Sequence, residues 1–377
     1  MNVVVLGGGL VGLPMALDLV ENQEFKVTLV DNRQKRLDEI HEKYNLEIYQ
    51  ADLSGARQIE NAVRNANIVV NAVPGNLGFQ VLKTVIEQGK NVVDITFAPE
   101  DFLKLDKLAK EHGVVAICDI GVAPGMSNIL TAYSNNKLDR TERIRIYVGG
   151  LPKIRQWPFE YRAVFSPADV IEEYTRTARF VRDGKMIEMP ALSETELIDL
   201  PGVGTLEAFN SDGLRSLLHT VDCPDIIEKT LRYPGHVEKM RLFRDTGFFS
   251  REPVSIDGHM IRPLDLTSRL LFPMWELGSE EDLTIMQIIV EGTKNKKKTV
   301  YTWDLLDYYD RKKNIHSMAR VTGYTATAAV RLMAAGRYDR QGISPPEYLA
   351  EDEEIVRFIL EDLKRKGVNY RESVKFI

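Results

Sequence analysis

The sequence contains little cysteine and no long hydrophobic run. Cys118 and Cys223 are the only two cysteines among 377 residues, and neither belongs to a CxxC motif or a Cys/His ligand spacing. This pattern predicts no disulfide framework and no metal site, and it is typical of buried thiols in a reducing cytoplasm. No apolar stretch reaches the roughly 20 residues that a membrane-spanning helix needs, so we expect no membrane partner.

An excess of basic residues is also missing. Lysine and arginine number 49 against 55 for aspartate and glutamate, which gives a net charge of -6. This balance argues against a nucleic-acid partner, because nucleic acids are bound through basic patches. The sequence has no GxSxG, HExxH, P-loop or kinase signature, which disfavours hydrolysis and phosphoryl transfer. The apolar start, VVVLGGGLVG, follows no basic segment, so we interpret it as a core strand and not a signal peptide.

Strand-like and helical segments alternate from residue 1 to about residue 124. Short β-branched runs such as KVTLVD and IVVNAVP are separated by amphipathic stretches such as RQKRLDEIHEKY. Segments that alternate at this spacing form βαβ units, and right-handed crossovers join these units into a parallel, doubly wound sheet. Residues 1–124 are therefore predicted as an α/β domain.

The pattern changes after residue 124. Residues 125–315 are predicted as an α+β domain with a mostly antiparallel sheet, in which Asp183-Gly184 and the lysine run 294–298 mark hairpin turns. Residues 316–377 are helical again, and the small residues of SMARVTGYTATAAVRLMAAG suit the close packing of a helix. We expect this C-terminal segment to return to the first domain, so that the α+β domain is an insertion.

A glycine motif opens the first predicted helix. Gly7, Gly9 and Gly12 fit G-x-G-x-x-G directly after a predicted strand, which is the context of a Rossmann-type dinucleotide-binding turn. Gly7 would permit the tight turn, Gly9 the approach of a pyrophosphate, and Gly12 the packing of helix on strand. A tight turn without a ligand is the alternative interpretation.

An acidic residue follows the motif at the expected distance. Asp31 ends the second predicted strand, where its carboxylate can bind the ribose hydroxyls of NAD and repel the 2'-phosphate of NADP. Arg33 and Arg36 could accommodate that phosphate, so NAD is favoured and NADP stays possible. For Asp52, a helix N-cap is the alternative to contact with the cofactor. The predicted cofactor-binding residues lie at or after the ends of the first four strands: Gly7, Gly9, Leu10, Val11, Gly12, Asp31, Asn32, Asp52, Asn71, Ala72, Val73 and Pro74.

Five further polar residues are candidates for a substrate site. Asp94 and Asp119 end the next two strands, where each could accept a proton or hold a cation, with turn stabilisation as the alternative. Arg215 and Arg232 could bind a carboxylate, and His236 could exchange a proton near neutral pH. The alternatives are surface ion pairs for the two arginines and a hydrogen-bonded position in a loop for His236.

Longer stretches carry a family resemblance from the first strand to about residue 345: VVLGGGLVG, DIGVAPGMSNIL, YVGGLP, SPADVIEEYTRTARFVRDGK, SDGLRSLL, TLRYPGH and SMARVTGYTA. In these stretches the chain resembles the saccharopine dehydrogenase-like family, and most closely the L-lysine 6-dehydrogenases. The resemblance implies a Rossmann domain completed by C-terminal helices, an inserted domain that binds substrate and forms a homodimer, and NAD(P)-dependent chemistry at a carbon–nitrogen bond. It also places Asp119 and Gly121 beside the nicotinamide, and Arg232 and His236 at the substrate.

The resemblance implies one principal reaction, the oxidative deamination of the ε-amine of L-lysine. A reductase that joins an amino acid to a carbonyl compound, as in saccharopine or carboxynorspermidine formation, is one alternative. A non-catalytic NAD-binding sensor is another, and the polar residues of 212–236 argue against it. The larger saccharopine-forming members carry an RDS-type segment where this chain has SDGLRS. The predicted catalytic residues are Asp119 and His236, and the predicted substrate-binding residues are Asp94, Gly121, Arg215 and Arg232.

Overall fold

The structure, a computed structural model that describes residues 1–377, contains two compact units. Unit 1 comprises Met1–Tyr133 and Ala319–Asn369, and unit 2 comprises Ser134–Met318 and Tyr370–Ile377. The chain therefore leaves unit 1, builds most of unit 2, returns to unit 1, and adds its last residues to unit 2. None of the helices combines the length and the apolar character that crossing a membrane requires.

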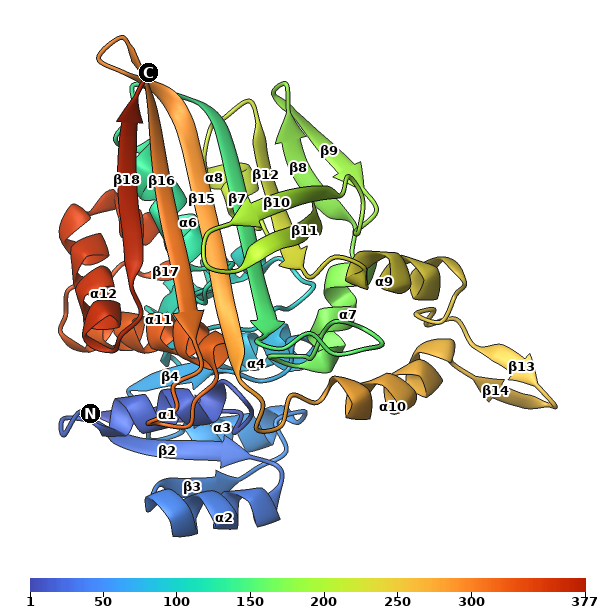
Figure 1. Cartoon of the computed structure of the whole chain (residues 1–377). Coiled ribbons are helices and arrows are strands. Elements are labelled where there is room, and N and C mark those ends of the chain that lie inside the picture. Colours follow the sequence, from blue (N-terminus) through green and yellow to red (C-terminus); the bar gives the residue numbers. More distant parts are fainter. The chain divides into compact units, whose positions relative to one another are not determined.

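Unit 1 is a parallel sheet whose strands are joined by helices (Figure 1). Its strands are β1 (Asn2–Leu6), β2 (Lys26–Asp31), β3 (Glu47–Gln50), β4 (Ile68–Asn71), β5 (Asn91–Asp94), β6 (Val115–Ile117) and β17 (Gly342–Ser344). Its helices are α1 (Gly12–Val20), α2 (Gln34–Tyr44), α3 (Ala56–Val63), α4 (Gly75–Glu87), η1 (Phe102–Leu105), α5 (Asp106–Glu111), α6 (Met126–Asn135), α11 (Ser317–Ala334), η2 (Pro346–Glu351) and α12 (Glu353–Arg365), of which α6 and α11 run across the unit boundary.

The seven strands of unit 1 lie in the order β17-β6-β5-β4-β1-β2-β3, and every neighbouring pair is parallel. Val3, Val5 and Val69 are fully buried, as expected where helices cover both faces of a sheet. The chain starts β1 in the interior of the sheet and extends it in both directions. The predicted Rossmann-type, doubly wound parallel sheet is confirmed.

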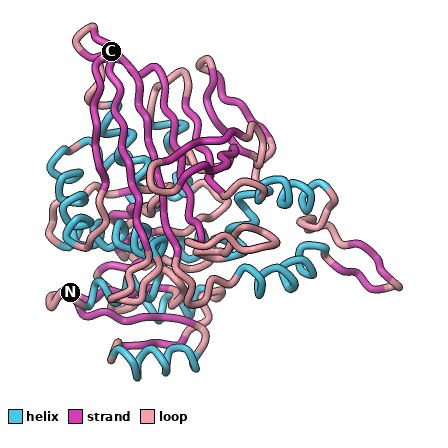
Figure 2. Tube along the Cα trace, viewed as in Figure 1, coloured by secondary structure: helices cyan, strands magenta, loops and turns pink.

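Unit 2 is a larger, mostly antiparallel sheet, and its long strands run side by side (Figure 2). Its strands are β7 (Arg140–Pro152), β8 (Ala178–Arg182), β9 (Lys185–Met189), β10 (Glu196–Leu200), β11 (Gly204–Asn210), β12 (Ile226–Arg232), β15 (Asp282–Lys294), β16 (Lys297–Tyr308) and β18 (Tyr370–Phe376), with β13 (Val254–Ile256) and β14 (His259–Ile261) as a separate hairpin. Its helices are α7 (Pro167–Thr175), α8 (Leu217–Thr220), α9 (His236–Asp245) and α10 (Pro263–Trp275).

Only one neighbouring pair of the nine-stranded sheet, β12 with β7, is parallel. The predicted mostly antiparallel sheet is therefore confirmed. Both predicted hairpin turns are confirmed as well, because Arg182 pairs with Lys185 and Lys294 pairs with Lys297. The two residues of each turn have positive φ angles, 51° and 72° at Asp183-Gly184 and 52° and 65° at 295–296. Two-residue turns of this kind match the twist of the paired strands.

The C-terminal segment contains two strands that the sequence analysis did not predict. β17 pairs with β6 at the edge of the parallel sheet, and β18 pairs with β16 in the other sheet. β17 is only three residues long, and β18 is largely exposed on both faces. Neither strand shows the buried alternating pattern from which strands are recognised.

Gly149 and its neighbour Gly150 in β7 provide a matched test of sheet packing. A Cβ at Gly149 would lie 2.7 Å from the carbonyl oxygen of Leu231, so the main chain of β12 would have to move. A Cβ at Gly150 would meet methyl groups of Met318 and Val164, so side chains and no main-chain atoms would have to shift. We expect Gly149→Ala to lower the free energy of unfolding by about 2 kcal/mol and Gly150→Ala by about half of that or less. Denaturant unfolding measures both, and equal losses would contradict this account.

Candidate functional site

The turn between β1 and α1 excludes side chains at two of its glycines. Gly7 has a φ of +104°, and a Cβ there would lie 2.5 Å from the carbonyl oxygen of Ala72. A Cβ at Gly12 would overlap the carbonyl oxygen of Gly7. At Gly9, by contrast, no atom lies within 4 Å of the position of a Cβ. The turn therefore opens the start of α1 to a ligand, where backbone N–H groups can bind an anion.

Asp31 lies beside this turn, at the end of β2, and is 7% exposed. Its Oδ2 accepts a hydrogen bond of 2.9 Å from the N–H of Gly8, and its two carboxylate oxygens accept from Nε and NH2 of Arg33 at 2.9 and 3.0 Å. Burial alone would raise the pKa of Asp31, but the hydrogen bonds from Arg33 and Gly8 outweigh it and lower that pKa. An ionised carboxylate therefore stands where the sequence predicted it, with the half-exposed Arg33 side chain over it.

The other predicted cofactor-binding residues occupy the neighbouring loops. Leu10 is 47% exposed in the glycine turn, and Val11 is the N-cap of α1. Asn32 is exposed in the bend after β2, and Ala72 and Val73 contact Gly7, with Pro74 as the N-cap of α4. Oδ1 of Asp52 accepts a 3.0 Å hydrogen bond from the N–H of Ser54, which stabilises the turn before α3. Asp52 is not a helix N-cap, because Gly55 occupies that position.

Buried polar groups gather at the ends of β4 and β5. Asn71 donates through Nδ2 to Oδ2 of Asp94 at 2.5 Å, and its own Oδ1 is buried without a hydrogen-bond partner. The N–H and the hydroxyl of Thr96 both donate to Oδ1 of Asp94 at 2.7 Å. A Cβ at Gly78 would overlap Thr96, so this glycine permits the close approach of α4. The cluster therefore holds Asp94 in one orientation.

A second carboxylate stands near Asp94. Asp119, which follows β6, is 2% exposed and has a φ of +54°. Burial raises the pKa of Asp94 to about 7 against the hydrogen bonds of Thr96 and Asn71, and the charge of Asp119 adds to the rise. Gly121 follows in a tight loop, in which its N–H donates to the carbonyl oxygen of Pro124 at 3.0 Å.

Arg232, at the end of β12, is 1% exposed and fully engaged in unit 2. Its NH2 group lies 2.5 Å from Oε2 of Glu173, and its Nε donates to the hydroxyl of Tyr174 at 3.2 Å. Its NH1 donates to the carbonyl oxygen of Leu231 at 3.0 Å, and the guanidinium carbon lies 4.5 Å from the ring centre of Tyr161. Arg232 is therefore a buried, paired cation and not a surface ion pair.

His236 begins α9 next to this cation and is completely buried. Its Nδ1 lies 2.7 Å from the carbonyl oxygen of Phe159, and its Nε2 lies 2.8 Å from the hydroxyl of Tyr174. A carbonyl can only accept, so Nδ1 carries the proton and Nε2 accepts from Tyr174. Burial and the charge of Arg232 lower the pKa of His236 to about 3, so the ring is neutral. Proton exchange at Nε2 would require the hydrogen bond to Tyr174 to open.

The segment SDGLRS lies against another buried carboxyl group of unit 2. Ser211 donates to Oε2 of Glu228 at 2.7 Å, and a Cβ at Gly213 would overlap that carboxyl group. Burial raises the pKa of Glu228 to about 8. Arg215, in the same segment, is 8% exposed and has a φ of +50°.

Within each unit the structure thus brings some of the predicted residues together. Asn71 and Asp94 are in direct contact in unit 1 near Asp119, and Arg232 and His236 share Tyr174 in unit 2. Sequence analysis missed a set of partners in these groups: the buried Thr96, Tyr161, Tyr174 and Glu228, and the partly exposed Glu173. The only sequence signal for Glu173 and Tyr174 was their place in the family-like stretch SPADVIEEY.

Comparison with known protein families gives the same division of the chain. The saccharopine dehydrogenase NADP binding domain matches residues 3–117, and the saccharopine dehydrogenase C-terminal domain matches residues 121–368. The chain belongs to the saccharopine dehydrogenase family. It is thus an NAD(P)-dependent oxidoreductase of the class that acts on CH–NH groups of amino acids.

Curated relatives within the saccharopine dehydrogenase family are distant. The NADP(+), L-glutamate-forming saccharopine dehydrogenase of Pyricularia oryzae is 23% identical over 332 residues, which cover 83% of this chain and 72% of that protein. The mitochondrial alpha-aminoadipic semialdehyde synthase of Rattus norvegicus is 24% identical over 67% of this chain, but the match spans only 29% of that protein. The carboxyaminopropylagmatine dehydrogenase of Synechocystis is 21% identical, and the match covers 93% of each chain.

Among solved structures, the apo saccharopine dehydrogenase (L-Glu forming) of Saccharomyces cerevisiae has the same fold. The two chains superpose with a TM-score of 0.81 at 18% identity, and the match covers 99% of each.

The residues of unit 1 fit a nicotinamide dinucleotide. The open space at Gly9 faces the start of α1, where the pyrophosphate of such a cofactor is bound. Asp31 ends β2, where a carboxylate is able to bind the ribose of such a cofactor, and Oδ1 of Asn71 is a buried acceptor that lacks a partner in the protein. The same site holds the carboxylate of Asp31, which favours NAD, and the guanidinium group of Arg33, which favours NADP.

Asp31 is expected to set the choice between the two cofactors. Asp31→Ala removes the ribose acceptor and releases Arg33, so the KM for NAD should rise about tenfold and the relative use of NADP should improve. Arg33→Ala is the matched variant, because it leaves the carboxylate in place and should weaken only NADP. Steady-state kinetics with both cofactors measure these effects, and unchanged NAD kinetics in Asp31→Ala would remove the assignment.

Proposed function

We propose that the chain catalyses the NAD(P)-dependent oxidative deamination of a basic amino acid, with the ε-amine of L-lysine as the reacting group. Action as a homodimer in the cytoplasm belongs to the same proposal. Membership of the saccharopine dehydrogenase family and the resemblance to L-lysine 6-dehydrogenases support it.

The observation that carries the proposal is the Asp94 carboxyl group, with a pKa of about 7. An amine releases a hydride from its carbon only in the uncharged form, so the reaction needs an acceptor for the ammonium proton. Above pH 7, Asp94 is ionised and buried, and Asn71 and Thr96 fix its orientation. Asp119 supplies a second carboxylate near Asp94 that can attract the substrate cation.

A bound NAD(P) would supply the acceptor for the hydride that leaves the carbon carrying the amine. Asp94 takes the proton of the substrate ammonium group before the hydride leaves. Alternatively, Asp119 takes that proton, and Asp94 remains as the anion that balances the charge of the substrate. Water then adds to the carbon–nitrogen double bond and ammonia leaves, so the product is an aldehyde that can close on the α-amine. The dry surroundings of Asp94 favour the uncharged amine over the ammonium ion.

Arg232 is proposed to bind the α-carboxylate of the substrate, and Arg215 to contribute to the same pocket. A substrate carboxylate would have to share the Arg232 guanidinium with Glu173 or displace it. His236 supports this arrangement through Tyr174, and its Nε2 would have to leave the Tyr174 hydroxyl before it could transfer a proton.

A substrate panel tests the proposed function directly. Purified protein is incubated with NAD or NADP and with lysine, ornithine, saccharopine or diamines, and the formation of reduced cofactor and of ammonia is followed at alkaline pH. We expect lysine to give both products in equal amounts. Reduced cofactor with saccharopine and none with lysine would support the alternative of a saccharopine-type enzyme, which the names of the curated relatives favour.

The pH profile of Asp94→Asn tests the proton acceptor. In the unmodified protein, kcat/KM for lysine should rise about tenfold per pH unit to about pH 7 and then level, because Asp94 becomes ionised there. In Asp94→Asn, kcat/KM should be about 100-fold lower at pH 8 and should keep rising toward the amine pKa of about 10. In Asp119→Asn, where asparagine tolerates the positive φ, the break should persist and move below pH 7, because the charge of Asp119 helps to raise the pKa of Asp94. A break near pH 7 that persists in Asp94→Asn contradicts the role.

A pair of variants tests Arg232. Arg232→Ala should raise the KM for substrate about 30- to 200-fold, with the Kd for the dinucleotide little changed. Because this change leaves Glu173 buried without its cation, the double variant Arg232→Ala/Glu173→Gln removes both charges. The KM should stay high in the double variant if Arg232 contacts the substrate. A return to the normal KM would show that Arg232 only neutralises Glu173.

A further inference from the structure

Asp18 is a buried carboxylate on α1, the helix that starts at the glycine turn, and it is 2% exposed. The position is unfavourable for a negative charge on two grounds. Burial removes the charge from water, and Asp18 lies toward the C-terminal end of the helix, where the backbone carbonyl groups concentrate negative partial charge. The carboxylate therefore needs strong partners.

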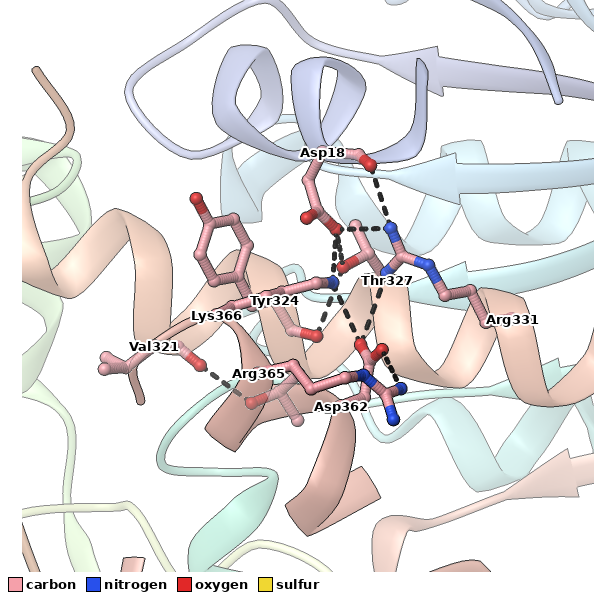
Figure 3. A network of polar contacts seen from close by, with 9 residues as sticks. Asp18, Val321, Tyr324, Thr327, Arg331, Asp362, Arg365 and Lys366 are labelled. Carbon is pink, nitrogen blue, oxygen red and sulfur yellow. Dashed lines mark hydrogen bonds and ion pairs between the residues drawn. The ribbon is translucent and has the colours of Figure 1, made fainter. Parts of the chain in front are cut away.

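These partners come from residues 319–369, the segment that returns to unit 1 before the last residues of the chain join unit 2 (Figure 3). Oδ2 of Asp18 accepts from the Thr327 hydroxyl at 2.5 Å, and it lies 2.7 Å from Nζ of Lys366 and 2.9 Å from NH2 of Arg331. Arg331 also donates to the main-chain carbonyl oxygen of Asp18 at 2.8 Å. The returning segment thus holds both the side chain and the backbone of α1.

A second carboxylate completes the network on α12. Asp362 lies 2.9 Å from Nζ of Lys366 and 3.4 Å from NH1 of Arg331, and it accepts from Arg365 at 2.9 Å. Burial alone would raise the pKa of Asp362, but the charges of Lys366 and Arg331 lower it. Asp362 and Asp18 share the cations Lys366 and Arg331. Asp362 itself forms its contacts with α11 and with the end of α12, and none with α1, so a variant at Asp362 provides a control.

The same segment also contacts the first residues of α1. A Cβ at Gly323 of α11 would lie 2.8 Å from Cγ of Met15 and 3.6 Å from Cγ1 of Val11. Val11 is the N-cap of α1, inside the glycine motif. Helix α1 is therefore held at its start by α11 and by the Gly7–Gly12 contact, and near its end by Asp18.

We infer that Asp18, Thr327, Arg331 and Lys366 are positioning residues for dinucleotide binding. They fix α1 along its axis, and so they set where the N–H groups at its start meet the pyrophosphate. Hydrogen bonds weaken steeply as their geometry departs from the ideal, so a small displacement of α1 weakens several bonds together. Asp18 lies six residues beyond Gly12, about 9 Å along the helix, and acts through α1 without touching the cofactor.

Dinucleotide affinity without any amine substrate tests this inference. The Kd values for NADH and NADPH are measured by fluorescence titration. In a separate assay, kcat is measured at saturating cofactor with the substrate that the panel identifies. Asp18→Asn should raise the Kd about 5- to 50-fold for whichever cofactor binds, and kcat should stay within about twofold. Thr327→Val, which removes one hydrogen bond at constant size, should raise the Kd about threefold. Lys366→Met should weaken binding as Asp18→Asn does, and Lys366→Arg should restore it.

Asp362→Asn is the control for a merely structural role. It should lower the melting temperature and leave the Kd within about twofold, because Asp362 does not hold α1. An unchanged Kd in folded Asp18→Asn and Thr327→Val, or an equal rise in Asp362→Asn, would overturn the inference. If Asp18→Asn does not fold, the Kd values of Thr327→Val, Lys366→Met and Lys366→Arg test the inference in its place. The titration uses no amine, so its result is independent of the substrate panel.

Discussion

A side chain at Gly12 would overlap the carbonyl oxygen of Gly7, so α1 starts too close to the end of β1 for a side chain to fit between them. This steric constraint directs the start of α1 toward the open space at Gly9. It also brings the N–H of Gly8 within hydrogen-bond distance of Asp31. The cofactor site of unit 1 is therefore built around a contact that only glycine permits, and the packing of α11 and the charges around Asp18 maintain it.

Two buried aspartates of unit 1 show how neighbouring groups set the pKa of the same type of side chain. Asp362 lies beside Lys366 and Arg331, and its pKa is lowered. Asp94 has hydrogen-bond donors that carry no charge and another carboxylate nearby, and its pKa is raised to about 7. The cations around the first group stabilise its charged form, which fastens helices together. The second changes charge near neutral pH, which suits a proton acceptor.

Local patterns explain the features that were predicted correctly. The glycine motif, Asp31 and the turns at 183–184 and 295–296 each depend on residues close together in the chain, so their spacing is sufficient. The strands β17 and β18 depend on edges that distant strands provide, and their own sequences have no distinctive period. The nature of the Arg232 and His236 sites was equally hidden, because burial beside Glu173 and Tyr174 is a property of the folded unit.

The sequence by itself determined the two sheet types, the position of the glycine turn and the carboxylate at the end of β2. These features follow from alternating hydrophobicity, from φ angles that only a few residues adopt, and from motifs that span about 30 residues. Tertiary structure alone decided that Thr327 meets Asp18 across 309 positions, that both ring nitrogens of His236 are engaged, and that Asp94 titrates near pH 7. Charge compensation and desolvation depend on neighbours in space, and a sequence orders only neighbours along the chain.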